Sequence, residues 1–333
     1  MLTTVLKLPT AVIGDDFERL NVLQIPLNIN GASGKTGYIR INAAIANKSY
    51  LTITGGNFYS DATFSTSLGN KVPVPTTYAE YYYFRIEQAG ARIDVDNVDN
   101  INAIGGTDYL FGDSSANAGG YVYTKDFYKM NLVRIWTSRN MLIGKVSEIP
   151  ETVNDLRVEV NGLEGDLTEL KPRTFATLRF RQTNVTGKLS DISDLATTVL
   201  ILDCPQVTGD VVDLLPLNSR GLLRLEIGNA AGSGTTGYPL TCSLNESIYF
   251  GTMARFAIQN IRLNRASLLN TLKSLAKTNW QITSSGVSNK AQVKLTTTMT
   301  ESDYNADSEI QAAKAALILK GQSANLELIM YFV

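Results

Sequence analysis

The sequence predicts a mainly β protein with some α-helix: a β-sandwich-like N-terminal module, then a solenoid of parallel strands that becomes helical in its last repeats. Two observations favour this fold class. Residues 1–128 alternate short strand-like runs with turns, whereas residues 129–333 contain repeats, three of which follow one another with a step of 22 residues. A chain of 333 residues is long enough for both parts to bury a core.

The repeat is clearest in three stretches, 156–170, 178–192 and 200–214. Each stretch begins with a leucine, at 156, 178 and 200, and contains a glycine, at 165, 187 and 209. Both residues therefore recur every 22 positions. Looser copies occupy 144–149 and 223–227. Self-similarity at this period indicates a leucine-rich-repeat-like solenoid.

One repeat unit shows why stacking is needed. Leu178 and Phe180 alternate with Arg179 and Arg181, which predicts a strand with one exposed face, and Gly187 lies in the turn that follows. A single unit cannot bury its apolar face, so neighbouring units supply the core and their strands form a parallel sheet.

The later units are longer and contain helices. Leucines at helical spacing predict a helix at 265–277, and an alanine-rich run predicts another at 307–320 that ends at Gly321. Strands are expected at 255–261, 280–283 and 326–332.

The N-terminal module is predicted from alternating segments at 38–42, 50–54 and 82–86. They are separated by turns rich in Gly, Asn, Ser and Thr, a texture typical of β-sandwiches and small barrels.

The composition narrows the function. The net charge is -1, so no basic field is available for nucleic acid. Histidine is absent, which removes the usual general base and the commonest metal ligand. Cys204 and Cys242 form no metal-binding or disulfide pattern, and we interpret Cys204 as a small buried residue. We therefore expect no catalytic, metal-binding or cofactor-binding residues and no enzymatic activity.

The N-terminus does not resemble a secretory signal, because Lys7 and Pro9 interrupt its apolar residues and acidic residues follow at once. No run approaches the roughly 20 apolar residues of a membrane span. We expect synthesis in a cytoplasm and no membrane insertion.

Two motifs invite functional interpretations that we do not favour. The GKT string within 31–38 lacks the first glycine of a phosphate loop, and 231–238 repeats it without the lysine, so both are interpreted as turns. Asp94, Asp96 and Asp99 miss the calcium-loop spacing; a solvated edge strand or turn is favoured over a calcium site.

Two surfaces remain as candidate binding sites. The aromatic cluster Tyr78, Tyr81, Tyr82 and Tyr83 either stacks on a sugar or partner, or is core plus ordinary surface. The outward rows of the solenoid sheet either dock a ligand or simply pair across strands. Those rows align Arg224 with Ile201, and Glu226 with Asp203. The candidate binding face consists of Arg157, Glu159, Arg179, Arg181, Asp203, Arg224 and Glu226.

Three strings carry a resemblance: Asn-Val-Thr-Gly-Lys-Leu-Ser-Asp-Ile at 184–192, Gln-Val-Thr-Gly-Asp-Val at 206–211 and Ser-Glu-Ile-Gln-Ala-Ala-Lys-Ala-Ala-Leu at 308–317. They resemble repeats from gut Bacteroidales genomes and their phages, over roughly residues 130–333. The texture is similar to that of head-fibre, tail-fibre or decoration proteins of crassvirus-like bacteriophages.

The resemblance implies a structural protein of the virion. It implies a homo-oligomer, with a trimer favoured, that contacts other virion proteins and displays its repeat domain to a host surface glycan or protein. A bacterial surface adhesin or glycan-binding protein is the first alternative, and a fibre-associated glycan depolymerase the second.

Overall fold

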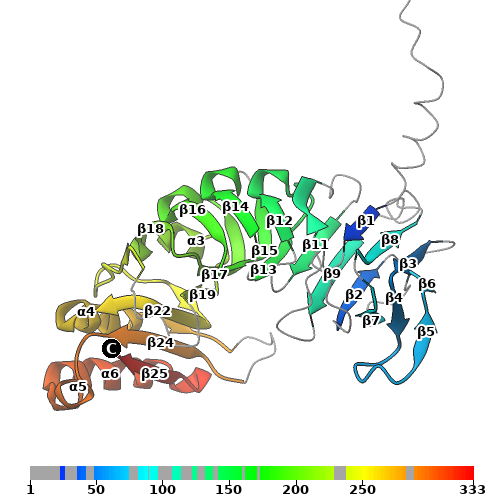
Figure 1. Cartoon of the computed structure of the whole chain (residues 1–333). Helices are drawn as coiled ribbons and strands as arrows, with labels where there is room; N and C mark the ends of the chain where they lie inside the picture. The colour runs from blue at the N-terminus through cyan, green and yellow to red at the C-terminus, as the bar shows by residue number, and fades with distance from the viewer. Residues whose placement is uncertain are drawn as a thin grey trace, which may run out of the picture. The chain divides into compact units, whose positions relative to one another are not determined.

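The computed structural model of the chain is mainly β, with antiparallel sheets in its N-terminal part, a ladder of parallel strands after them and helices near the C-terminus (Figure 1). This confirms the fold class. The structure describes residues 23–26, 36–42, 49–74, 82–88, 90–96, 107–113, 122–125, 132–137, 142–159, 162–170, 173–228, 238–282 and 289–333.

The chain divides into two compact units. Unit 1 comprises residues 1–143 and 148–153, and unit 2 comprises residues 144–147 and 154–333. Strand β11 (Leu132–Thr137) belongs to unit 1, since it pairs with β9 (Thr107–Asp113) of the same unit.

Unit 1 contains two groups of antiparallel strands, in the orders β1-β8-β3-β6 and β9-β2-β7-β4-β5. The first group is β1 (Leu23–Pro26), β3 (Tyr50–Thr54), β6 (Lys71–Pro73) and β8 (Arg92–Val95). The second adds β2 (Thr36–Asn42), β4 (Gly56–Tyr59), β5 (Ser67–Gly69) and β7 (Tyr82–Ile86) to β9. The three predicted strand segments lie in β2, β3 and β7, where alternate side chains such as Ile53 and Phe84 are buried.

Unit 2 is a ladder of parallel strands, each hydrogen-bonded to the next. Its strands are β13 (Asp155–Glu159), β15 (Thr174–Arg181), β17 (Ala196–Asp203), β19 (Arg224–Ile227), β22 (Arg255–Leu263), β24 (Gln292–Thr297) and β25 (Glu327–Phe332). The leucines 156, 178 and 200 lie directly side by side, as the 22-residue step predicts, and none is exposed.

A second layer of short elements covers the apolar side of the ladder. Its parallel strands are β14 (Gly162–Asp166), β16 (Asn184–Lys188), β18 (Val207–Asp210) and β20 (Leu240–Thr241). Strand β12 (Leu142–Lys145) pairs with β10 (Val122–Tyr123). One-turn helices follow β12, β14, β16 and β18 in turn: η2 (Val146–Glu148), η3 (Leu167–Leu170), η4 (Leu189–Ile192) and η5 (Val211–Leu214).

The repeated glycine has a backbone reason. Gly187 has φ +119°, and a Cβ there would lie 3.1 Å from the backbone nitrogen of Leu167 in the preceding repeat. Three residues after β16 ends, Asp191 accepts a hydrogen bond from the backbone N–H of Lys188 at 2.7 Å, which fixes the start of η4. Gly187 and Asp191 together fix the turn that leads from β16 into η4.

The later units contain α3 (Leu215–Asn218), α4 (Arg265–Leu275), α5 (Glu301–Ala306), α6 (Ser308–Lys320) and the short η6 (Gln322–Ala324). Helices α4 and α6 confirm the two predicted helices. Gly321 ends α6 with φ -88°, so glycine is required there for space: a Cβ would meet the Leu326 side chain at 2.3 Å.

One predicted strand is wrong in its place. Of the predicted strand at 280–283, the described residues 280–282 do not form the next rung of the ladder. Strand β23 (Asn279–Trp280) pairs instead with β21 (Thr252–Met253) outside the ladder, and the next rung is β24. Trp280 is buried, and its indole N–H donates to the carbonyl of Leu275 at the end of α4. Trp280 therefore packs at the end of α4 and does not extend the ladder.

Candidate functional site

The outward face of the unit 2 ladder carries aligned polar rows, which we call the charged face. One row contains Arg157, Arg179, Ile201, Glu226, Ala257 and Lys294, and a neighbouring row contains Asp155, Thr177, Val199, Arg224, Arg255 and Gln292. A third row contains Glu159, Arg181 and Asp203, which lie side by side on β13, β15 and β17.

The predicted alignment of β19 is wrong by two residues. Arg224 lies beside Val199, and Glu226 lies beside Ile201 instead of Asp203. The short helix α3 lengthens this repeat, so Leu225, and not Leu223, takes the place of Leu200 in the core. The shift moves Glu226 to the middle of the face.

Glu226 is the centre of an ion-pair network. Its side chain is only 2% exposed, and its carboxylate lies 2.5 Å from Arg224, 2.8 Å from Arg255 and 3.5 Å from Arg181. A buried carboxylate is stable only when cations compensate for its lost hydration. Three arginines from three different strands supply that compensation.

The remaining pairs are more local. Arg157 forms a two-pronged contact with Asp155 of its own strand, at 2.8 and 3.1 Å. Glu159 lies between Arg179, with which it forms a salt bridge, and Arg181, at 3.6 Å. Pairing between charged side chains of neighbouring strands therefore accounts for part of the charged face. This is the alternative to ligand docking in the sequence-based interpretation.

Asp203 is a buried carboxyl group at the edge of the network. Its Oδ1 accepts a hydrogen bond from the Tyr238 hydroxyl, whereas its Oδ2 has no hydrogen-bond partner among the described residues. Burial raises the pKa of Asp203, although the Tyr238 hydrogen bond and the charge of Arg181 oppose the shift. The group bears its charge less readily than an exposed aspartate.

Cations exceed carboxylates in the middle of the face. Three carboxylates, Glu159, Asp203 and Glu226, lie among a larger cationic set of Arg179, Arg181, Arg224, Arg255 and Lys294. Burial and neighbouring arginines lower the pKa of Arg179 to about 10. Burial, with nearby arginines, also lowers the pKa of Arg255 and Lys294. An added anion would relieve this repulsion.

Sequence reasoning misses part of this site. Arg255 begins a predicted strand whose register with the other strands does not follow from the 22-residue step, and Lys294 lies on a rung that the sequence does not predict. Tyr238 lies between β19 and β22 in the chain, and no pattern within one repeat points to it. Only the first part of the face, with its constant step, is predictable from the sequence.

The predicted aromatic patch does not form one surface in the described residues. Tyr82 packs on Phe58, and Tyr83 packs edge-on against Tyr38 and Phe64, with ring centroids 6.0 to 6.5 Å apart. Both tyrosines are half-buried neighbours on β7, so their side chains point to opposite faces. Tyr78 and Tyr81 lie outside the described residues.

The other candidate sites have ordinary partners where they are described. Asp94 pairs with Arg92 at 3.1 Å and Asp96 lies 3.9 Å from Lys71; Asp99 lies outside the described residues. Among the residues that the structure describes, no three candidate ligands gather at a metal site, and no helix has the length and apolarity to cross a membrane. The glycine-rich segments 31–35 and 231–237 are likewise not described.

The cysteines confirm the interpretation of Cys204. Its thiol is buried beside the Thr183 hydroxyl, at 3.2 Å, and burial raises its pKa to about 12. Cys242 is buried as well, and its pKa is raised to about 11. Neither thiol has the thiolate character of a nucleophile.

Comparison of the chain with protein-family models, with curated proteins and with solved structures finds no match.

Proposed function

We propose that this chain is a structural protein of a bacteriophage particle, of the fibre or decoration type, whose charged face binds an anionic polymer on the host surface. The resemblance of its repeats supports the virion setting. The excess of arginine over carboxylate in the middle of the charged face is the observation that carries the binding function.

The chemistry of the face favours carboxylate-bearing ligands. Guanidinium groups bind carboxylates through paired N–H donors, and here they project from a rigid sheet instead of from loops. Arg179, Arg181 and Arg224 retain about a quarter of their side-chain exposure, so a ligand can reach them. Neighbouring side chains along a row lie about 4.8 Å apart, the spacing of adjacent strands, which suits a polymer with repeated charges.

The binding test uses the purified chain and polygalacturonate, with neutral dextran as the reference polymer. We expect polygalacturonate to bind in low salt and to be released as the salt concentration rises, because the contacts are largely ionic. Equal binding of dextran, or no binding of polygalacturonate, contradicts the proposed ligand class.

Two substitutions give opposite expected results. Arg179→Gln removes a cation and should weaken binding roughly tenfold, a loss typical of one charged hydrogen bond. Glu226→Gln removes the central anion and should tighten binding while lowering the stability of the fold, because the surrounding arginines then repel one another. A purely structural network predicts loss of stability with no gain in affinity.

A matched control comes from the same unit. Arg220 is exposed and donates to the carbonyl of Asp194, away from the rows of the charged face. Arg220→Gln changes net charge as Arg179→Gln does, and should leave polygalacturonate binding unchanged.

The virion setting has its own test. Mass spectrometry of purified phage particles should detect the chain in constant proportion to the major structural proteins. If the chain binds the polymer but is absent from purified particles, the proposed binding function stands and the proposed place in the virion is wrong.

A further inference from the structure

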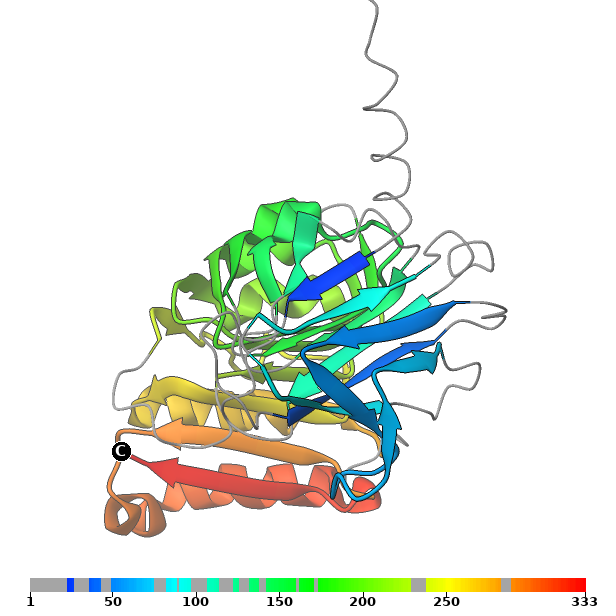
Figure 2. The same ribbon diagram turned by 45° about the vertical axis from the view of Figure 1, so that its right-hand side comes forward.

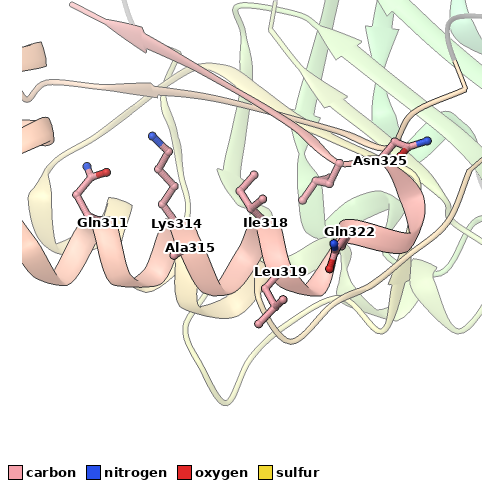
Figure 3. Close-up of a pocket in the computed structure, with 8 residues that line it drawn as sticks. Gln311, Lys314, Ala315, Ile318, Leu319, Gln322 and Asn325 are labelled. Carbon is pink, nitrogen blue, oxygen red and sulfur yellow. The ribbon is translucent and has the colours of Figure 1, made fainter.

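The grooves of unit 2 differ from its charged face in their chemistry. Figure 2 shows α6 behind the red strand β25 and the orange β24, and a groove of about 610 Å³ runs along this helix. Its lining is largely apolar, with Ile318, Leu319 and Leu326, and Lys314 lies at its border (Figure 3). A small oxyanion therefore meets a single cation among the described residues of this groove.

A second groove, of about 530 Å³, is lined by residues of β14, η3 and β16. It contains the carboxylates of Glu164, Asp166 and Glu169, with Lys145 as their cationic neighbour. Hydrogen bonds from Thr168 lower the pKa of Asp166, so this carboxylate keeps its charge. Three carboxylates around one ammonium group repel an anion. Compared with both grooves, the charged face is the surface that attracts an oxyanion.

The arginines in the middle of the charged face are not equivalent. Glu226 holds Arg224 and Arg255 closely, with nitrogen–oxygen distances of 2.5 and 2.8 Å. Arg181 is held more loosely, because its ion-pair partners Glu226 and Glu159 lie 3.5 and 3.6 Å away. Its guanidinium group donates no hydrogen bond to any residue that the structure describes. Arg181 therefore has donors available that Arg224 and Arg255 have committed to Glu226.

Arg179 lies two residues before Arg181 on β15, so both side chains project from the same face of the strand. Arg179 forms a salt bridge with Glu159. The Nε atoms of Arg179 and Arg181 are both buried and lack a hydrogen-bond partner in the described part of the chain. Each side chain nevertheless keeps 24% of its exposure. The two guanidinium groups are thus neither fully paired nor fully hydrated, yet a ligand can reach them.

We propose that Arg181, with Arg179 beside it, is the anchoring subsite of the charged face and binds one oxyanion group of the ligand through paired N–H donors. This inference rests on the proposed function and names the residue that selects the ligand. The guanidinium fork matches two oxygens of a carboxylate or phosphate group, whereas the ammonium group of lysine is a point charge. The subsite therefore depends on the shape of the guanidinium group as well as on its charge.

The first experiment compares Arg181→Lys with Arg181→Gln in the binding of polygalacturonate. Because lysine keeps the charge but loses the fork, we expect both variants to bind about tenfold more weakly than the wild type. Arg220→Lys is the matched control, since Arg220 lies away from the rows of the charged face, and it should bind as the wild type does. Arg181→Lys with wild-type affinity overturns the proposal, because charge alone would then explain the binding.

Inorganic phosphate tests the subsite without the polymer. At equal ionic strength, replacing chloride with phosphate should raise the thermal midpoint of the wild type more than that of Arg181→Gln, because a ligand that binds the folded state stabilises it. The general salting effect of phosphate acts on both proteins alike, so the difference between them measures the subsite. Circular dichroism confirms that each variant folds. Equal shifts in both proteins overturn the proposal.

The subsite and the proposed function fail separately. If phosphate acts through Arg181 but polygalacturonate does not bind, the subsite stands and the polymer ligand is wrong. If polygalacturonate binds equally to the wild type and to Arg181→Lys, the proposed function stands and the subsite is wrong.

Discussion

At the scale of single residues, a few positions explain why the repeat has the sequence it has. Gly187 and its equivalents adopt a positive φ against the backbone of the preceding repeat, and an acid three residues after each strand caps the turn. These residues carry no side-chain chemistry toward a ligand. Their regular spacing reflects a backbone requirement.

Gly187→Ala should lower the free energy of unfolding by about 1–3 kcal/mol, the usual cost of forcing a side chain into this backbone region, with the close contact to Leu167 in addition. Gly221→Ala is the control: its φ is +101°, but no atom lies within 4 Å of an added Cβ. Urea denaturation of both variants checks the difference. Equal losses would show that contact with the preceding repeat is unimportant.

Asp203 gives a prediction in pH. Burial raises the pKa of Asp203 in the folded chain above its ordinary value of 3.8. With respect to this group, the folded state is therefore most stable below pH 3.8, where Asp203 is protonated in both states, and it loses stability as the pH rises through the raised pKa. Asp203→Asn should therefore be more stable than the wild type at pH 7, with the gain shrinking as pH falls toward 3.8. Urea midpoints across this range measure it; a gain independent of pH contradicts the assignment.

At the scale of elements, neighbouring repeats are joined by more than strand pairing. Asn218, the last residue of α3, donates to the carbonyls of Leu222 and Thr252 at 3.0 and 2.7 Å. Its side-chain oxygen accepts from the backbone N–H groups of Gly251 and Thr252 at 2.8 and 3.2 Å. One side chain thus satisfies four backbone groups where two irregular repeats meet.

Asn218→Ala should cost about 2 kcal/mol or more, because it leaves these backbone groups without partners. Asn270→Ala, on the exposed side of α4, should cost nothing and serves as the control. Thermal and urea denaturation check both variants. Asn218→Asp keeps the size but loses the donors, so it should be destabilised almost as much as the alanine variant.

At the scale of the whole molecule, the two units follow different principles. In unit 1, distant segments pair antiparallel, as β2 does with β7 and β9. In unit 2, each rung pairs with the rung before it, so the ladder can grow without closing on itself.

The regular repeats are predictable in detail because a fixed step of 22 residues imposes a fixed register. Leu156, Leu178 and Leu200 are placed side by side, and Arg157 beside Arg179, by that step alone. Where α3 lengthens the repeat, the rule fails, and Arg224 and Glu226 lie two residues away from their predicted positions. Strand β24 is not predicted, because the sequence pattern of residues 280–283 also resembles a strand and comes first in the chain.

The sequence by itself determined the fold class, the period, the two long helices and the buried state of Cys204, since each depends on local spacing and apolar pattern. Tertiary structure alone decided that Glu226 gathers Arg181, Arg224 and Arg255, and that Tyr238 meets Asp203. Those contacts join residues whose separation varies from one repeat to the next. Only the stacking of unequal repeats in space fixes which side chains meet.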